Sequence, residues 1–475
     1  MLEPNVFQIP ELCGRIARYL SMQDAINCVQ VCKEWNTIFI NVIWYTIEVD
    51  VETNSKLPDQ EALAKHFQFI RNLILRNSSL DLIPSSCPNL RSLSIERVSC
   101  LQANILRGKQ QLIALELKSV ELDDASVLWK LVASELHQLR ELYLIVADID
   151  QDSIEHFWMV CSRLCTLQLR RVELSRGPDS ALDFPQMRSM KIGVLIGLNL
   201  EDYRDWFSNC PNLTHLQWAH RTTFPLSTMS VHVVRESWSL LQSLDLHHAI
   251  ISDKDLAMIV EGMRKVTELF ATVAGIGPYT FSALRPHFAG LEALSYPLSH
   301  HTRSHLGGDV TCRMINEVLT SCPKLRQLAV GALRPEDLLS KNEQPWVCTS
   351  LSVLNFQIGF PRISDPALHH AIFAQLSRLH SLEFLGITGP GNSDAENRQS
   401  LDFRLSMGLS QLATLTRLKH ILLEDAEQNM ELEDLQWLFE NLRGLQEVSG
   451  RLNMDDNKER ELQTTIAMFK TNRYP

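Results

Sequence analysis

Cysteine and histidine are the side chains in this sequence with the most obvious chemistry, because both bind metal ions and cysteine also forms disulfides. The chain has 11 cysteines and 16 histidines among 475 residues, and no C-x-x-C pair occurs. Cys28 and Cys32 lie one helical turn apart and are interpreted as packing residues. Four other cysteines each stand three residues before an apolar residue that starts a predicted strand: Cys87, Cys161, Cys210 and Cys322. Such repetition is typical of small buried side chains, so we predict no metal site and a reducing compartment.

Catalytic motifs are absent from the sequence. It contains no G-x-x-x-x-G-K-[ST], G-x-G-x-x-G, H-E-x-x-H or G-x-S-x-G. Histidines are adjacent at 247/248, 300/301 and 369/370. Neighbouring side chains on a strand point to opposite faces, so we expect solvated or core histidines. We therefore predict no catalytic residue and no cofactor, and a protein that is not an enzyme in its own right.

Any binding residue must be positioned by strands and helices, and the sequence predicts that these occur as a repeated unit. The apolar pattern L-x-x-L-x-L recurs in steps of mostly about 20 to 28 residues, which is typical of leucine-rich repeats with one strand and one returning helix per unit. The first positions are Ile70, Leu90, Leu112, Leu139, Leu164, Met187, Leu213, Leu241, Val266, Leu291, Leu325, Leu351, Leu379, Leu418 and Leu445. Helical apolar stripes precede several strands, at 154–161, 203–210 and 315–322.

Two longer steps between first positions predict loops, at 299–309 and 386–397. Insertions in repeat arrays become loops on one face, and loops commonly carry specificity. A tolerated surface insertion is the alternative interpretation for either loop.

A cationic strip is predicted on the outward positions of four successive strands: Arg170, Lys191, His215, Gln217 and His247. Arginine can form paired hydrogen bonds with an oxyanion, so the strip would suit an acidic or phosphorylated segment of a protein substrate. Ordinary surface charge is the alternative.

The first 48 residues have a different pattern. Apolar residues fall at helical spacing in short pieces, which predicts a few short helices. Pro10 suits the first turn of a helix, and Asp24 can accept from free N–H groups at another helix start. About 40 residues bury too little apolar surface to be stable alone, so an exposed apolar face here is a candidate binding site.

This segment resembles the F-box family, through Ile9-Pro10-Glu11-Leu12, Ile16, Tyr19-Leu20, Asp24, Val31-Cys32-Lys33, Trp35 and Trp44. The resemblance implies a helical surface that binds the Skp adaptor of cullin-based ubiquitin ligases. The implied adaptor contacts are Ile9, Pro10, Leu12, Ile16, Leu20, Val31, Cys32 and Trp35. Ala25 stands where the family usually has leucine, which implies one weaker packing contact. The alternative is a helical cap on the first repeat. The Cys-Pro-x-Leu sequences at 87, 210 and 322 resemble the cysteine-containing class of leucine-rich repeat often found behind an F-box.

Composition agrees with a folded protein that binds other proteins. Hydrophobic residues make up 45% and charged residues 21% of the chain. The net charge of −11 and the pI near 5.8 disfavour a nucleic-acid binder. Glu3 and Pro4 stand where a secretory signal needs a basic start, and no apolar stretch suits a membrane span. We expect a cytoplasmic or nuclear location.

Taken together, these patterns predict an α/β fold, with a short three-helix F-box module followed by a curved leucine-rich-repeat solenoid. The predicted parts are an F-box-like domain at 5–48, a linker and first helix at 49–69, and about 15 repeats at 70–475. The function implied is substrate recognition in a Skp-cullin-F-box (SCF) ubiquitin ligase. An adaptor-independent scaffold and a repeat-based regulator of small GTPases are the alternatives from other classes.

Overall fold

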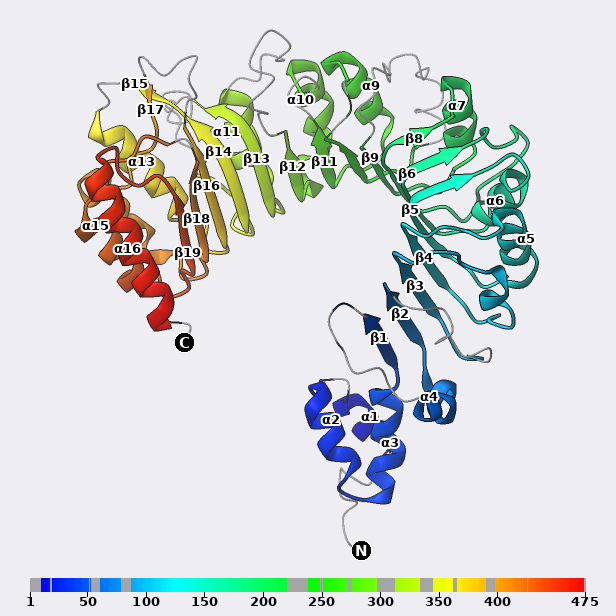
Figure 1. Ribbon diagram of the computed structural model, residues 1–475. Helices are drawn as coiled ribbons and strands as arrows, with labels where there is room; N and C mark the ends of the chain where they lie inside the picture. The colour runs from blue at the N-terminus through cyan, green and yellow to red at the C-terminus, as the bar shows by residue number, and fades with distance from the viewer. Residues whose placement is uncertain are drawn as a thin grey trace, which may run out of the picture. The chain divides into compact units, whose positions relative to one another are not determined.

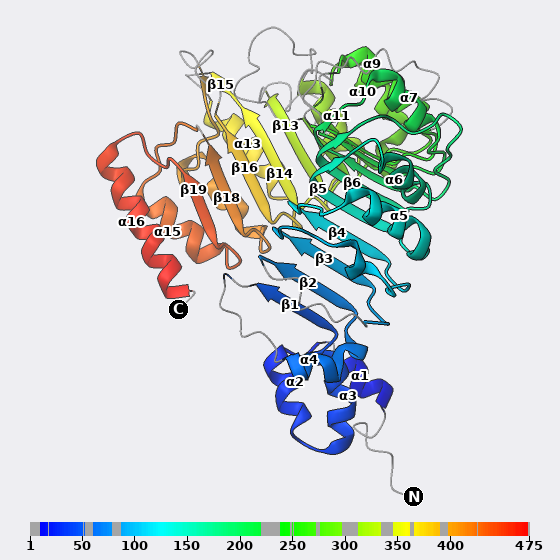
Figure 2. The ribbon, with the colours of Figure 1, turned by 45° about the vertical axis from the view of Figure 1, so that its right-hand side comes forward.

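The computed structural model consists of two compact units, Met1–Leu213 and Thr214–Pro475, which we describe one at a time (Figures 1 and 2). The structure describes residues 10–17, 19–50, 52, 60–77, 87–219, 238–247, 249, 251–271, 276–296, 312–333, 345–361, 365–389, 398–424 and 426–473. No helix among these residues is both long enough and apolar enough to cross a membrane.

The first unit begins with three short helices, α1 (Pro10–Ala17), α2 (Met22–Val29) and α3 (Lys33–Ile43). Pro10 starts α1, as predicted. The capping residue of α2 is Ser21, whose hydroxyl oxygen accepts the N–H of Asp24 at 3.2 Å and donates to the Asp24 carboxylate at 2.6 Å. The prediction that Asp24 itself caps the helix was therefore wrong by one turn. The sulfur of Cys32 accepts the N–H of Trp35 at 3.5 Å and so caps α3.

The rest of the first unit is a parallel sheet with helices along one of its sides (Figure 1). Its strands are β1 (Thr46–Asp50), β2 (Asn72–Arg76), β3 (Ser92–Glu96), β4 (Ala114–Lys118), β5 (Glu141–Ile149), β6 (Thr166–Leu174), β7 (Ser189–Ile192) and β8 (Leu195–Ile196). Its remaining helices are α4 (Gln60–His66), α5 (Ala125–Glu135), α6 (Ile154–Cys161) and α7 (Leu200–Ser208), with short 3-10 turns η2 (Phe67–Phe69) and η4 (Ala103–Leu106).

Strand β1 joins the three helices directly to the sheet. It starts two residues after Trp44, which ends α3, and it pairs in parallel with the whole of β2. The Trp44 ring also stacks on His66 at 4.8 Å between ring centroids. The leucine spacing predicted no strand here, and β1 crosses the predicted domain boundary between residues 48 and 49. Trp44, Ile47 and Val49 in fact continue the L-x-x-L-x-L spacing, with tryptophan in the first position.

The second unit is also a parallel sheet with helices. Its sheet strands are β9 (His215–Trp218), β10 (Ser243–Leu246), β11 (Glu268–Ala271), β12 (Ala293–Ser295), β13 (Gln327–Leu333), β14 (Val353–Ile358), β16 (Phe384–Thr388), β18 (His420–Glu424) and β19 (Glu447–Gly450), and β15 (Phe360–Pro361) pairs antiparallel with β17 (Arg398–Gln399). Its helices are α9 (Asp253–Gly262), α10 (Pro278–Leu284), α11 (Cys312–Ser321), α13 (Pro366–Leu376), α15 (Leu432–Asn441) and α16 (Asp456–Arg473), with 3-10 turns η7 (Arg285–Gly290), η9 (Leu405–Met407) and η10 (Leu409–Thr414).

The repeat register follows the predicted leucine spacing with one correction. A strand begins two residues after each predicted first position except Leu379, because β16 begins at Phe384. The first position of this unit is therefore Leu382, and Leu385 and Ile387 complete the pattern. Leucines spaced by three at 379, 382 and 385 allow both registers, and the alternation that follows Leu385 decides between them.

The core lies between sheet and helices and uses the predicted stripes. Ile154, Phe157, Trp158 and Cys161 of α6 are all at most 3% exposed. The ring of Trp158 packs at 4.9 Å from that of Trp206 on α7, edge to face. The four cysteines of the repeated position are also at most 1% exposed: Cys87, Cys161, Cys210 and Cys322. Their prediction as buried apolar side chains is confirmed, and burial raises the pKa of each thiol.

The two predicted loops have different outcomes. Residues 299–309 lie outside the described residues. The second loop was placed at 386–397, but Gly386 lies inside β16, which continues to Thr388. A side chain at position 386 would meet Asn355, whose Oδ1 would lie 2.8 Å from an added Cβ, so this glycine serves close strand packing.

Candidate functional site

Helix α1 carries two apolar stripes, and only one of them is buried. Cys13 and Ala17 are at most 1% exposed and form the inner stripe. Leu12 and Ile16 have the same spacing of four residues, yet they are 37% and 39% exposed. Side chains four residues apart lie on one face of a helix, so Leu12 and Ile16 present a continuous apolar surface. No other described residue of the chain covers that surface fully.

Helix α2 repeats the arrangement. Ala25 is buried, whereas Met22 and Ile26 are 53% and 37% exposed. Val31, in the turn before α3, is 64% exposed. Ala25 faces inward. An alanine here, in place of the leucine usual in F-box sequences, therefore changes the packing between the helices.

The other predicted adaptor contacts differ in their surroundings. Trp35 is half-buried, and its ring packs at 5.4 Å from that of Phe39, so it supports the inside of α3. Cys32 is exposed and caps α3, which corrects its interpretation, together with Cys28, as a packing pair on one helix. Leu20 is half-buried. Ile9 lies outside the described residues, and of Pro10 only the backbone is described.

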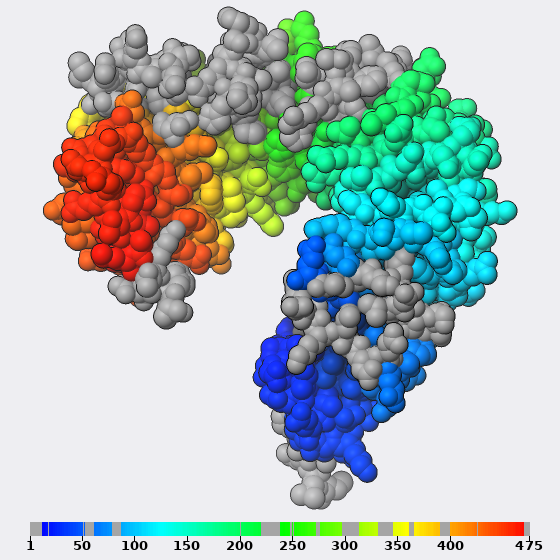
Figure 3. Space-filling model, viewed as in Figure 1, coloured from blue at the N-terminus to red at the C-terminus, as the bar shows by residue number. Residues whose placement is uncertain are grey.

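The structure adds two residues to this surface that sequence reasoning left out of the contact set. Met22 and Ile26 lie on the uncovered stripe of α2. Their signal in the sequence was the four-residue spacing of two apolar side chains beside a small one, Ala25. We call Leu12, Ile16, Met22, Ile26 and Val31 the apolar helical face. Exposed apolar side chains of this kind on a folded protein are a candidate protein-binding site. Figure 3 shows the helices that carry them, in dark blue, at the surface of the molecule.

The predicted cationic strip falls partly in each unit. In the first unit, Arg170 and Lys191 are exposed on β6 and β7, and Lys191 lies beside Gln168 of β6. Neither forms an ion pair within the described residues of that unit. Both therefore remain candidates for binding an anionic group.

In the second unit, His215 and Gln217 point outward from β9, and Gln217 pairs with Asp245 of β10. The Nδ1 atom of His247 lies 2.9 Å from the Asp245 carboxylate, and the ring packs at 5.5 Å from Phe270. A carboxylate beside His247 compensates any positive charge there. This part of the strip is thus less cationic than its residue types predict.

In the first unit, the outward positions of the neighbouring strands β3, β4 and β5 carry several charged side chains that have partners. Glu116 accepts the Ser94 hydroxyl at 2.6 Å and lies 2.7 Å from the Lys118 ammonium. The Tyr143 hydroxyl donates to Glu141 at 3.0 Å. Burial, this hydrogen bond, and the charges of Glu141 and Glu116 raise the pKa of Tyr143 to about 12. Tyr143 therefore stays neutral at physiological pH and donates a hydrogen bond to the Glu141 carboxylate.

Comparison with known proteins gives a family match for the helical segment alone. Residues 10–49 match the family model described as F-box-like. None of the curated proteins matches this sequence.

Several solved leucine-rich-repeat structures are similar to this one. An internalin from Listeria monocytogenes is 15% identical, with a TM-score of 0.37, over 84% of this chain and 92% of its own. A leucine-rich-repeat protein from Leptospira interrogans is 13% identical, with a TM-score of 0.38, over 82% of this chain and 98% of its own. The repeat ectodomain of a plant membrane receptor kinase from Arabidopsis thaliana is 15% identical, with a TM-score of 0.39, over 81% of this chain and 44% of its own.

Proposed function

We propose that this chain, which carries an F-box-like domain at residues 10–49 ahead of leucine-rich repeats, is the substrate-recognition subunit of an SCF-type ubiquitin ligase. The F-box-like helices bind a Skp-family adaptor, and through it a cullin. The repeats bind a protein substrate. The chain acts in the cytoplasm or nucleus, where these partners occur.

The apolar helical face is the observation that supports this proposal. Its five side chains are between 37% and 64% exposed although they lie within 20 residues of one another, from 12 to 31. Burying the part of each side chain that remains exposed is worth about 0.5 to 2 kcal/mol, so a partner that covers all five gains several kcal/mol. Protein interfaces commonly place such apolar anchors at their centre.

The direct attachment of this face to the repeats supports the same role. Five residue pairs between β1 and β2 hold the helices to the sheet. A rigid connection keeps a bound substrate at a fixed position relative to the adaptor. The chain then accelerates ubiquitin transfer by positioning and raised effective concentration, with no catalytic side chain of its own.

The test is adaptor binding by the double variant Leu12→Ala and Ile16→Ala. Alanine preserves helix α1 while removing most of the exposed apolar surface on that helix. We expect the affinity for a purified Skp-family adaptor to fall about tenfold or more, because roughly 1 to 2 kcal/mol of burial at the interface is lost. Isothermal titration calorimetry measures the affinity, and the unfolding midpoint should stay close to that of the wild type.

A matched control is the variant Val127→Ala and Met159→Ala, which truncates two side chains that are 48% and 51% exposed on α5 and α6. This control should bind the adaptor as the wild type does. If the wild-type chain shows no measurable affinity for the adaptor, or if both double variants bind equally well, the proposal is wrong and an adaptor-independent scaffold becomes the better interpretation.

A further inference from the structure

A groove opens at the carboxyl ends of strands β4, β5, β6 and β8 in the first unit, with a volume of about 1020 Å³. Part of its lining is aliphatic: Val146, Val194 and Ile196 are 45%, 40% and 54% exposed. β-branched side chains on neighbouring strands normally pack against a covering layer. Here they form an uncovered apolar surface inside a groove, which suits side chains of a ligand.

The rest of the lining is strongly acidic, with six carboxylates: Glu121, Asp123, Asp124, Asp148, Asp150 and Glu173. Two of these serve the fold. Asp124 accepts the N–H of Val127 at 3.0 Å, and Asp150 accepts that of Ser153 at 2.8 Å. The other four form no ion pair within the described residues.

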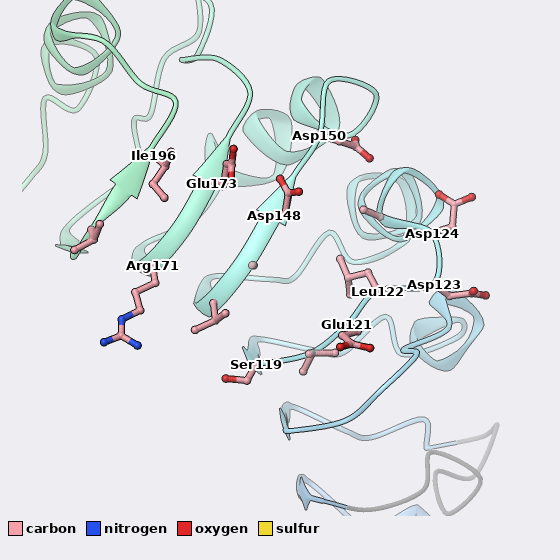
Figure 4. Close-up of a pocket in the computed structure, with 15 residues that line it drawn as sticks. Ser119, Glu121, Leu122, Asp123, Asp124, Asp148, Asp150, Arg171, Glu173 and Ile196 are labelled. Carbon is pink, nitrogen blue, oxygen red and sulfur yellow. The ribbon is translucent and has the colours of Figure 1, made fainter.

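Asp148 and Glu173 are the most informative of these carboxylates. They are direct partners in the parallel pairing of β5 with β6, and in Figure 4 their carboxylates stand side by side. Two like charges on adjacent strands, about 5 Å apart, destabilise a sheet. A positive charge placed between them removes that cost.

The one cation in the lining does not fill this role. Arg171 has a left-handed backbone with φ of +56°. Its guanidinium points away from Asp148 and Glu173 in Figure 4, and it pairs with no carboxylate among the described residues. No cation of the lining therefore lies between Asp148 and Glu173.

The size of the groove limits the ligand. Four neighbouring strands span about 15 Å, which an extended chain of about four or five residues covers. Within the described part of the chain, no three of the acidic groups converge as a metal ion requires. A second copy of this chain carries a net charge of −11 and is repelled.

We propose that this groove binds a short extended segment of a partner protein in which lysine or arginine alternates with aliphatic residues. The cationic side chains lie against Asp148 and Glu173, and the aliphatic ones pack on Val146, Val194 and Ile196. Binding to the groove is independent of the adaptor. That the segment belongs to a protein marked for ubiquitination rests on the function proposed above.

The test uses the full chain and a fluorescein-labelled peptide in which lysine and isoleucine alternate over six residues, with anisotropy as the readout. The variant Asp148→Asn with Glu173→Gln keeps the shape of the groove and removes two charges. We expect it to weaken binding about tenfold. The variant Ile196→Ser should weaken this peptide several-fold, yet leave binding of a lysine–serine peptide of the same length unchanged.

The charge-matched control is Glu433→Gln with Glu440→Gln, which removes two exposed carboxylates from α15 in the second unit. It should bind the peptide within about twofold of the wild type, since the altered charges lie outside the groove. Equal weakening by both double variants would show that the overall negative charge attracts the peptide, and would overturn the proposal. Equal wild-type affinity for the lysine–serine peptide would also overturn it, because the apolar lining would then contribute nothing. Either result leaves the adaptor test unaffected.

Discussion

Lys109 is a buried lysine. It is 1% exposed, and its ammonium group has no hydrogen-bond partner within the part of the chain that the structure describes. Burial lowers the pKa of Lys109, and the nearby Cys87 opposes this shift only in part. A buried charge that lacks compensation costs several kcal/mol or loses its proton. Lys109 therefore reduces the stability of the first unit.

We predict that Lys109→Met raises the free energy of unfolding at pH 7 by about 1 to 3 kcal/mol, since methionine keeps most of the side-chain length and removes the charge. The pKa of Lys109 is lowered in the folded state. At a pH between that lowered pKa and the ordinary value of 10.5, the unfolded chain therefore binds more protons than the folded chain does. The free energy of unfolding of the wild type thus rises with pH in that window. The variant lacks this pH dependence because it has no ammonium group at position 109. Urea unfolding at several pH values measures both effects.

The control for this change is Lys130→Met on α5, where the lysine is exposed. Its stability should stay within about 0.5 kcal/mol of the wild type. A destabilised Lys109→Met chain would contradict the argument, since it would mean that the ammonium contributes to packing or bonding.

At the scale of elements, the strands of the first unit share a turn. One residue with positive φ stands five positions after the start of β2, β3, β4, β5 and β6: Asn77, Arg97, Ser119, Val146 and Arg171. Asparagine tolerates the left-handed region because its short side chain bonds locally, whereas a β-branched residue there is strained. Val146, with φ of +58°, is the strained member of the series.

We expect Val146→Asn to raise stability by about 1 kcal/mol, because the left-handed conformation costs a β-branched residue roughly 1 to 2 kcal/mol. The same change at Val127, an equally exposed valine within helix α5, should not stabilise, because asparagine is no better than valine in a helix. Thermal and urea unfolding measure both. If Val146→Asn is destabilising, the conformation at this position is relaxed by neighbouring contacts and the strain argument is wrong.

The leucine spacing predicted nearly every strand start because the same alternation recurs in each unit. It missed β1, where Trp44 replaces the aliphatic first position, and it misplaced one unit at Leu379, where leucines spaced by three permit two registers. Helices α6, α7 and α11 followed from their apolar stripes. The family resemblance supplied Leu12, Ile16 and Val31, whereas Met22 and Ile26 required the folded helices, since spacing alone does not tell which stripe is buried.

At the scale of the whole molecule, the two proposed binding surfaces share no residue. The apolar helical face belongs to α1, α2 and the turn at Val31, and the groove to the ends of four strands. Continuous parallel pairing from β1 to β6 lies between them. Coupling between two sites requires an element with two arrangements whose equilibrium both ligands shift, and a continuously paired sheet favours a single arrangement.

Adaptor and peptide should therefore bind independently. We predict that a saturating adaptor changes the affinity for the lysine–isoleucine peptide by less than about twofold, and that Leu12→Ala with Ile16→Ala leaves peptide affinity unchanged. Conversely, Asp148→Asn with Glu173→Gln should leave adaptor affinity unchanged. Peptide titrations with and without adaptor measure the coupling. Mutual exclusion of the two ligands would show that the surfaces overlap or are linked.

The sequence by itself determined the helical module, the repeat period, the buried cysteine position and the residues of the apolar helical face that resemblance implied. Only the tertiary structure decided which acidic residues meet at the groove. The left-handed residues Val146 and Arg171 each shift the strand alternation by one, so Asp148 and Glu173 face outward although strict alternation from Glu141 and Thr166 turns them inward. A strict period-two reading from the strand start misses such a shift, because the neighbouring strands hold the left-handed residue in place and no glycine or asparagine marks the position in β5 or β6.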